Sequence, residues 1–266
     1  MSKSNPRLFQ PGLNPDVPDG RDYRHTGLVT ELLTIPKPDL MVSKVDWSQW
    51  MTDVKDQETE GSCVGFATVA AIEALENRKK RNRPDLSEEM AYNYARKYDD
   101  FPGENYSGTT VKGCVKAIHK HGVCEEKYWR YNPKIVSQPH YHYLQNARRH
   151  KIVGYTNVAR KSSGKRTNRY AINAYDVARA LKKSPVVAGF FIDESMSYIG
   201  RNGIISIENV GNRNWGHAMC LVSYNPMIKM FKIKNSWGKL WGNYGYGYMH
   251  LDVLQKCIIS AWTISI

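Results

Sequence analysis

The chain has 266 residues, of which 41% are hydrophobic and 24% are charged, and its formal net charge is +13. This composition is typical of a globular protein and excludes a disordered or fibrous chain. The longest apolar stretch, residues 185–192, is too short to cross a membrane, and residues 1–10 lack the apolar core of a secretory signal. We therefore expect an intracellular protein that neither spans nor binds a membrane.

The first 44 residues form an extension that is rich in Pro, Asp, Gly and Arg and shows no sustained apolar periodicity. Such a segment cannot bury a core of its own, so we expect it to lie on the surface or over a cleft. Beyond it, apolar residues recur at three- and four-residue steps, which predicts helices. Capping residues, prolines and one glycine delimit these helices at 63–83, 87–98, 110–121 and 176–183.

The second half of the chain is rich in β-branched and aromatic residues between Gly, Asn and Pro, a composition typical of strands. Strands are predicted at 186–192, 218–224, 230–234 and 258–264. Because helices precede strands and do not alternate with them, the fold class is α+β with two lobes. We expect a helical lobe at 45–150 and a β-rich lobe at 151–266, after the extension at 1–44.

The five cysteines are an odd number, so at least one thiol is unpaired within the chain. Cys63 opens a predicted helix directly after Gly61 and Ser62. There its sulfur lies beside unpaired backbone N–H groups at the positive end of the helix dipole, which favours the thiolate. Six residues earlier, the side-chain amide of Gln57 can point at an anion that forms next to the sulfur.

Two further segments supply a base and its support. His217 begins an apolar strand, and Asn235 ends the next one, followed by Trp237 and Trp241 among glycines. A thiolate needs an imidazolium partner, and the ring needs a group that fixes its orientation. Asn235 can hold the ring while the tryptophans exclude water from it.

Taken together, these segments resemble the papain family of cysteine peptidases in residue type, order and spacing. The resemblance implies a nucleophile, a base, an orienting amide and an oxyanion-hole side chain, in that order at Cys63, His217, Asn235 and Gln57. It also implies that Trp237 and Trp241 cover the Asn–His pair. The implied fold has a helical N-terminal lobe and an antiparallel, β-barrel-like C-terminal lobe, with the active site in the cleft between them.

Weaker matches extend the resemblance over roughly residues 45–266. Leu86-Ser87-Glu88 resembles the start of the family's second helix, and residues 184–187 resemble its Gly-Pro-Val strand. By the same resemblance Gly108, Trp215 and Gly216 face the substrate. The residue at the far end of the main specificity pocket falls in segment 249–257 and stays unassigned.

The chain departs from the family pattern at Glu60, where a disulfide-bonded cysteine is usual, and at Val64, where an aromatic residue is usual. The missing cysteine agrees with a reducing compartment. The remaining cysteines are therefore expected to be reduced packing residues, with a Cys114–Cys124 bridge left open: Cys114, Cys124, Cys220 and Cys257. The extension is also too short for the family's long helical propeptide.

The predicted function is hydrolysis of polypeptides by a cysteine endopeptidase or exopeptidase through a thioester intermediate. A papain-like binding module without peptidase activity is one alternative. A hydrolase or transferase acting on a non-peptide amide is another, since it would use the same residues. We hypothesise that residues 1–44 lie across the cleft and restrain activity, as in a zymogen, although a structural strap is an equal interpretation.

Other features carry weaker signals. The i, i+2 histidine pairs His119/His121 and His140/His142 lack matching partners at ligand spacing, so we expect no metal and no cofactor. The basic runs 78–83 and 160–169 are interpreted as solvated surface, which makes the +13 charge a surface property and predicts no nucleic-acid partner. The sequence does not indicate an oligomeric state.

Overall fold

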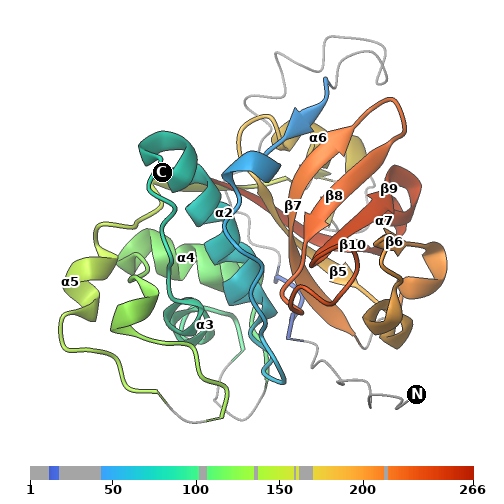
Figure 1. The fold of residues 1–266 in the computed structure, drawn as a ribbon. Coiled ribbons are helices and arrows are strands. Elements are labelled where there is room, and N and C mark those ends of the chain that lie inside the picture. The colour runs from blue at the N-terminus through green and yellow to red at the C-terminus, as the bar shows by residue number, and fades with distance from the viewer. Residues whose placement is uncertain are drawn as a thin grey trace.

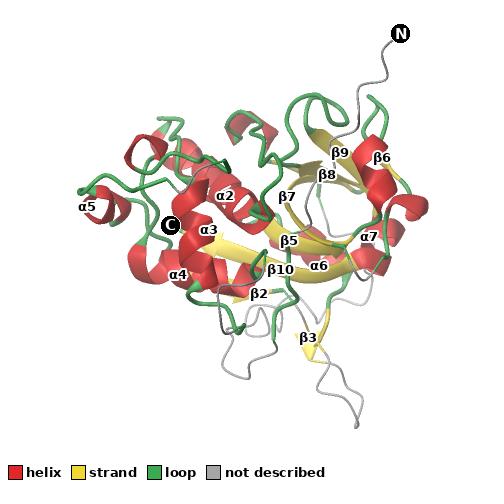
Figure 2. Cartoon of the chain, turned by 90° about the horizontal axis from the view of Figure 1, so that it is seen from below, coloured by secondary structure: helices red, strands yellow, loops and turns green. Residues whose placement is uncertain are grey.

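The computed structural model describes residues 12–17, 43–101, 107–134, 137–158, 160–161, 170–212 and 215–266. Within these residues the helices of segment 63–147 gather on one side, whereas the sheet lies on the other with helices α6 (Ala174–Ala180) and α7 (Leu251–Cys257), as Figure 1 shows, so the fold is α+β. Helix α2 (Cys63–Lys80) lies between the two parts and contacts both the other helices and the centre of the sheet. Figure 2 shows the same division from below.

The helical part is built around α2, with α3 (Glu88–Arg96), α4 (Val111–His121) and the short α5 (Tyr143–Ala147). Single 3-10 turns lie at Ser48–Trp50 and Glu126–Tyr128. Fourteen of the residues of α2 are buried, because its Ala, Gly and Val side chains let neighbours approach on most sides. The predicted helix at 63–83 is three residues too long, since Arg81 takes a left-handed conformation and ends the helix.

Two predicted helix caps are present in the structure. The Ser87 hydroxyl accepts a hydrogen bond from the Met90 N–H at the start of α3, and Thr110 accepts one from Gly113 at the start of α4. Gly122 ends α4 with a positive φ of 80°. The helix predicted at 176–183 is α6 (Ala174–Ala180), which begins earlier because Asn173 caps it.

The sheet contains eight strands in the order β2-β10-β5-β7-β8-β9-β6, and β1 pairs beside this path with β7. Their bounds are β1 Val45–Asp46, β2 Gly154–Asn157, β5 Val186–Phe191, β6 Ile204–Ile205, β7 Gly216–Asn225, β8 Met230–Lys234, β9 Tyr246–His250 and β10 Ile258–Ser265. All pairings are antiparallel except β6 with β9. The expected barrel-like closure is wrong: the terminal strands β2 and β6 do not pair, and the sheet stays open.

The four predicted strands correspond to β5, β7, β8 and β10, each within two residues at its ends. Strand β7 is buried along almost its whole length and lies at the centre of the sheet, which explains its continuous apolar sequence. Elements that we did not predict include β2, β9 and helix α7 (Leu251–Cys257). A separate hairpin joins β3 (Arg160–Lys161) to β4 (Tyr170–Ala171), and 3-10 turns lie at Glu194–Tyr198 and Ile207–Asn209.

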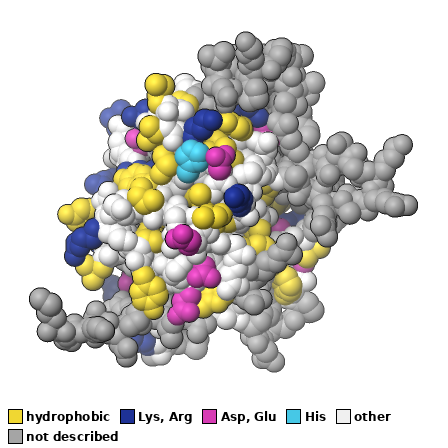
Figure 3. Space-filling view, turned by 90° about the vertical axis from the view of Figure 1, so that its right-hand side faces the viewer, with side chains coloured by type: hydrophobic (Ala, Val, Ile, Leu, Met, Phe, Trp, Pro, Cys, Tyr) yellow, Lys and Arg dark blue, Asp and Glu magenta, His cyan; other side chains and the backbone are white. Residues whose placement is uncertain are grey.

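The basic run 78–83 makes contacts within the chain. The Arg78 guanidinium lies 4.6 Å from the ring centroid of Trp47, and that of Arg81 lies 5.5 Å from the ring of Trp50. Of the second basic run, residues 162–169 lie outside the described residues. On the face shown in Figure 3, basic, acidic and hydrophobic side chains are interspersed.

All five cysteines are buried and free, including Cys114 and Cys124. In the part of the chain that the structure describes, helices fall short of the length and apolarity that crossing a membrane requires.

Candidate active site

Cys63 is the first residue of α2 and is completely buried where the helix meets the sheet. The backbone N–H of Ala218, in β7, points at its sulfur, with an N···Sγ distance of 3.4 Å. Because Ala218 directly follows His217, this contact brings the predicted nucleophile beside the predicted base. The preceding residue, Ser62, hydrogen-bonds through its hydroxyl to the Tyr131 hydroxyl at 2.8 Å and does not cap the helix with its side chain.

The imidazole of His217 is held from two directions. Its Nε2 lies 2.8 Å from the Asn235 side-chain oxygen, and its ring stacks on Trp237 with centroids 4.5 Å apart. Trp241 meets Trp237 edge-on and donates its own indole N–H to the Met196 carbonyl. Since Nε2 faces an acceptor oxygen, it carries the proton, and Nδ1 is left as a buried nitrogen without a hydrogen-bond partner among the described residues.

Gln57 is completely buried and joins two loops. Its side-chain N–H donates to the Glu60 carbonyl at 2.7 Å, and its side-chain oxygen accepts from the Ser236 hydroxyl at 2.6 Å. The Gln57 backbone N–H also donates to the Ser236 carbonyl. Ser236, which sequence reasoning missed, therefore fixes the amide of Gln57, while its own N–H donates to Asn235.

The expected thiolate at the helix N-terminus is not what this structure favours. Burial raises the pKa of Cys63 to about 11, although backbone N–H groups, among them those of Ala218 and Gly12, act in the opposite direction. Burial also lowers the pKa of His217 to about 4, against the opposing effect of its bond with Asn235. Both groups are neutral near pH 7 because solvent is excluded from them, and desolvation here outweighs the helix dipole.

Residues 12–17, which we call the strap, lie against the cysteine between the helices and the sheet (Figure 1). The Leu13 N–H donates to the Gly216 carbonyl at 3.0 Å. On the opposite side Thr109 exchanges hydrogen bonds with the strap: its N–H donates to Gly12, and its carbonyl accepts from Asn14. The strap therefore covers Cys63, whose side chain has no exposed surface.

Of the residues predicted to bind substrate, two glycines adjoin the strap. A Cβ at Gly216 would lie 2.2 Å from the Leu13 carbonyl oxygen, and one at Gly108 would lie 2.5 Å from that of Gly12. Gly189, in β5, was not predicted and is equally close to the Leu13 side chain. Trp215 is half-buried against the core of the sheet, and its carbonyl accepts a hydrogen bond from the backbone of Ile192.

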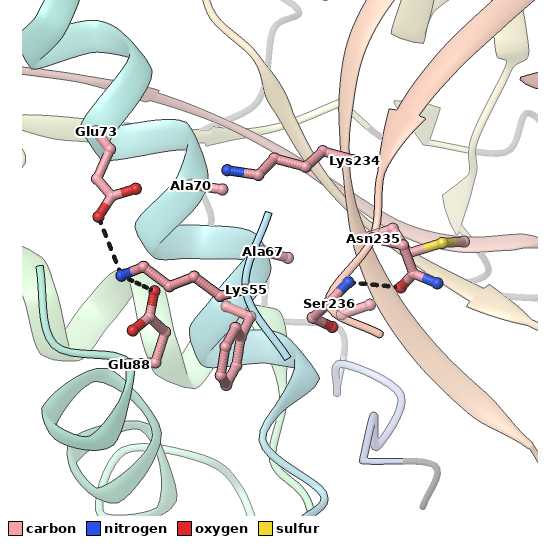
Figure 4. A pocket seen from close by; sticks show the side chains of 11 residues that line it. Lys55, Ala67, Ala70, Glu73, Glu88, Lys234, Asn235 and Ser236 are labelled. Carbon is pink, nitrogen blue, oxygen red and sulfur yellow. Dashed lines mark hydrogen bonds and ion pairs between the residues drawn. The ribbon is translucent and has the colours of Figure 1, made fainter. Parts of the chain in front are cut away.

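Behind Asn235, three buried charged residues and the partly exposed Lys55 lie between the helices and the sheet. We call these four residues the interlobe cluster: Lys55, Glu73, Glu88 and Lys234. They surround a cavity of about 20 Å³, roughly the space of one water molecule (Figure 4). The Lys55 ammonium lies 2.8 Å from Glu88 and 3.5 Å from Glu73.

Lys234 directly precedes Asn235 and donates to the backbone carbonyl of Thr52 at 3.0 Å. Its burial lowers its pKa, and the negative charge of Glu73 partly offsets this effect. Sequence reasoning missed the interlobe cluster, because isolated Lys and Glu residues far apart in a sequence are typical of a solvated surface. The cluster fixes β8, and therefore Asn235, relative to α2.

The four histidines of the two i, i+2 pairs do not share a common site. The His121 ring bonds to the Tyr98 hydroxyl, His119 packs edge-on against Tyr155, and His140 and His142 are exposed. Across the described residues, three or more His, Cys, Asp or Glu side chains are not grouped in a way that could hold a metal ion.

Comparisons with known proteins point in one direction. The family described as "Papain family cysteine protease" matches residues 41–265. An uncharacterized peptidase C1-like protein of Acanthamoeba polyphaga mimivirus is 32% identical over 200 residues, which are 72% of this chain and 62% of that protein. The chain spans about 60% of the length of the first curated relatives that it matches.

Solved structures share the fold at lower identity. Xylellain, a cysteine protease from Xylella fastidiosa, aligns with a TM-score of 0.73 and 24% identity, covering 100% of this chain and 99% of that one. Digestive procathepsin L 3 of the Tenebrio molitor larval midgut aligns with a TM-score of 0.69 and 17% identity, covering 98% of this chain and 76% of that one.

Proposed function

The chain belongs to the papain family of cysteine proteases, and on that premise we propose that it hydrolyses peptide bonds through a thioester at Cys63. The observation that carries this proposal is the contact of α2 with β7, together with the position of Asn235 directly after the neighbouring strand β8. It sets the cysteine at a helix N-terminus beside His217, whose ring Asn235 holds at 2.8 Å. A nucleophile, a base and an orienting group in this order are what acyl transfer through a thiol needs.

The proton positions support defined roles. With the proton on Nε2 of His217, the Nδ1 lone pair takes the proton of the Cys63 thiol as the sulfur attacks the peptide carbonyl. The same nitrogen then gives that proton to the leaving amine. In the second half of the reaction, His217 removes a proton from water, and the resulting hydroxide equivalent hydrolyses the thioester.

The oxyanion of each tetrahedral intermediate needs preorganised donors. We assign these to the Cys63 backbone N–H and the Gln57 side chain. A side-chain amide carries two N–H protons, and Gln57 uses one of them on the Glu60 carbonyl, which leaves the other for the substrate. The bond from Ser236 fixes which end of the amide is the donor.

The strap supports a proposal about regulation: residues 1–44 act as a pro-segment that restrains activity. Its contacts with Thr109 and Gly216 leave Cys63 without exposed surface, so a substrate must displace it. The five free cysteines further support, as a proposal, action in a reducing compartment.

Labelling and turnover test the proposal directly. We expect the chain to react with a thiol-directed epoxide and to cleave fluorogenic peptides, and we expect Cys63→Ala to do neither. The matched control is Cys257→Ala, which removes a buried thiol from α7 on the sheet side and should keep both properties. If neither the unmodified chain nor a variant whose strap is displaced by Gly12→Val labels or cleaves, the binding-module alternative replaces this proposal.

A further inference from the structure

The carboxylate of Asp16, near the end of the strap, is bound by a set of donors that the catalytic reaction does not use. One oxygen accepts hydrogen bonds from the Trp262 indole N–H, at 2.8 Å, and from the Ser260 hydroxyl. The other oxygen accepts from the backbone N–H of Lys112, at 2.9 Å. Ser260 and Trp262 are 3% and 0% exposed, so the protein provides these donors from its interior. We call Ser260, Trp262 and the Lys112 N–H the carboxylate subsite.

The donors of this subsite select an ion that only accepts hydrogen bonds. An indole N–H and a backbone N–H can only donate. The Ser260 hydroxyl is also committed, because the Trp262 N–H lies 3.1 Å from its oxygen, so its proton is directed at Asp16. An amide in place of the carboxylate would turn an NH₂ group toward at least one of these donors and lose that bond.

The surrounding charge has the matching sign. The Lys112 N–H lies in the first turn of α4, at the positive end of the helix dipole. The Lys112 side chain is only 2% exposed, and its ammonium donates to the Val17 carbonyl at 3.2 Å. Burial raises the pKa of Asp16, and the three donors and the positive charge of Lys112 oppose this rise.

The subsite joins the two parts of the molecule along the cleft. Lys112 belongs to α4 in the helical part, whereas Ser260 and Trp262 belong to β10 in the sheet. Three positions earlier in the strap, the Leu13 side chain lies against Gly189 and the Leu13 backbone against Gly216, beside the cysteine. The carboxylate subsite therefore lies on the path that a substrate must follow once the strap leaves.

We propose that the carboxylate subsite is a substrate subsite for an Asp or Glu side chain, three positions along the chain from a hydrophobic side chain that takes the place of Leu13. Asp16 occupies it while the strap is bound. This inference rests on the proposed function, because it names the class of polypeptide that the same cleft accepts. The natural substrates are accordingly acidic peptides, and the strap imitates one.

A binding experiment tests this without requiring turnover. The protein is the full chain carrying Cys63→Ala and Asp16→Ala, so that it cannot cleave and its own strap carboxylate is absent. The probes are fluorescent peptides with the sequence of residues 12–17, Gly-Leu-Asn-Pro-Asp-Val, and its analogue with Asn in place of Asp. We expect fluorescence anisotropy to show about tenfold tighter binding of the Asp peptide, because one charge-assisted hydrogen bond is worth about that factor.

Variants of the subsite make the test specific. Adding Ser260→Ala should bring the ratio of the two dissociation constants close to 1, and Trp262→Phe should lower it as well. Ser265→Ala removes an exposed hydroxyl from the same strand and should keep the full ratio. If Trp262→Phe does not fold, Ser260→Ala alone decides the outcome. Equal binding of the two peptides would overturn the inference.

Cleavage-site profiling of the Asp16→Ala chain on a peptide library then separates substrate recognition from strap recognition. We expect enrichment of Asp and Glu at one position three residues along the chain from a preferred hydrophobic residue, in either chain direction. Cleavage without this enrichment overturns the inference and leaves the proposed function intact. Absence of cleavage together with preferential binding of the Asp peptide overturns the proposed function, and the substrate subsite with it.

Discussion

Two regions join the helices to the sheet, one in front of the catalytic pair and one behind it. In front, the strap is held by neutral backbone hydrogen bonds to Thr109 and Gly216, and by its Asp16 carboxylate. Behind, the interlobe cluster joins the same two parts where Lys234 of β8 donates to the Thr52 carbonyl at 3.0 Å, beside the ion pair of Lys55 with Glu88. Both regions exclude water, but only the strap lies in the path of a substrate.

The two regions have different roles: the strap controls access to Cys63, whereas the interlobe cluster holds the helices and the sheet in position. The backbone contacts of the strap with Thr109 and Gly216 are ordinary hydrogen bonds that water can replace when the strap leaves. Water cannot replace the charged partners of the interlobe cluster in the same way, because removing one of them leaves another charge buried without compensation. We therefore expect changes in the strap to alter the reactivity of Cys63, and changes in the cluster to alter the stability of the protein.

The largest expected effect is that of Glu73→Gln in the interlobe cluster. Glu73 is 1% exposed, accepts the Leu86 N–H at 2.9 Å, and its charge offsets that of the buried Lys234, so its neutralisation leaves a buried ammonium undercompensated. We expect the free energy of unfolding, measured with urea, to fall by about 3–5 kcal/mol. Asp85→Asn is the matched control, because Asp85 contacts Lys55 of the same cluster but is 66% exposed. It should cost about 0–1 kcal/mol. Equal losses would show that burial does not distinguish the two acids.

The next effect concerns the front of the site and is measured on catalysis. Gln57→Ala removes an oxyanion donor, so kcat for a peptide substrate should fall by about 10²–10³. The strap is present in both proteins, and its influence cancels in the ratio. Thr59→Ala, an exposed change in the same loop, should keep kcat within about twofold. A Gln57→Ala variant that loses substrate affinity and not kcat would assign the amide to ground-state binding.

The candidate catalytic residues could be proposed from sequence because the signal for each is local. A cysteine after Gly-Ser at a helix start, a histidine opening an apolar strand and an asparagine before Trp237 define their surroundings within a few residues. The structure brings Cys63, His217 and Asn235 together through α2, β7 and β8.

The rest could not be predicted because it depends on contacts between distant segments. The interlobe cluster takes one residue each from a loop, α2, α3 and β8. The expected thiolate failed for the same reason: the strap that buries Cys63 has no periodicity that would reveal where it packs. Segment 249–257, left unassigned, forms the end of β9 and helix α7, whereas the cleft residue Ser260 lies just beyond it.

A smaller effect is expected when the strap is dislodged. In Gly12→Val, a Cβ would lie 2.1 Å from the Gly61 carbonyl oxygen, a backbone atom that cannot move aside easily. Such overpacking costs about 1–3 kcal/mol, which raises the labelling rate of Cys63 by a thiol-directed epoxide by roughly tenfold or more. Val17→Ala, at an exposed strap position, should label like the unmodified chain. Unchanged labelling of Gly12→Val would mean that the strap does not limit access.

The smallest effect is a dependence of strap binding on pH, whose sign follows from the burial of the catalytic pair. Because burial raises the pKa of Cys63 to about 11, the covered state is favoured below pH 9 and loses this advantage as the pH rises toward 11. Because burial lowers the pKa of His217 to about 4, the covered state is also favoured above pH 6.5 and loses this advantage as the pH falls toward 4. The raised pKa of Asp16 acts oppositely at the acidic end, since it strengthens strap binding as the pH falls.

Alkylation of Cys63 by iodoacetamide measures this dependence. In the unmodified chain, the rate should rise continuously between pH 7 and 10, because a thiol with a pKa of about 11 reaches no plateau in that range. In Gly12→Val, loss of the strap removes part of the burial, so the rate should level off at lower pH. Asp16→Ala weakens the binding of the strap at its far end without contacting the cysteine. Its pH profile should therefore shift in the same direction as that of Gly12→Val, but by a smaller amount. Superimposable profiles for all three proteins would mean that the strap does not set the pKa of the thiol, and that its burial by α2 and β7 alone is responsible.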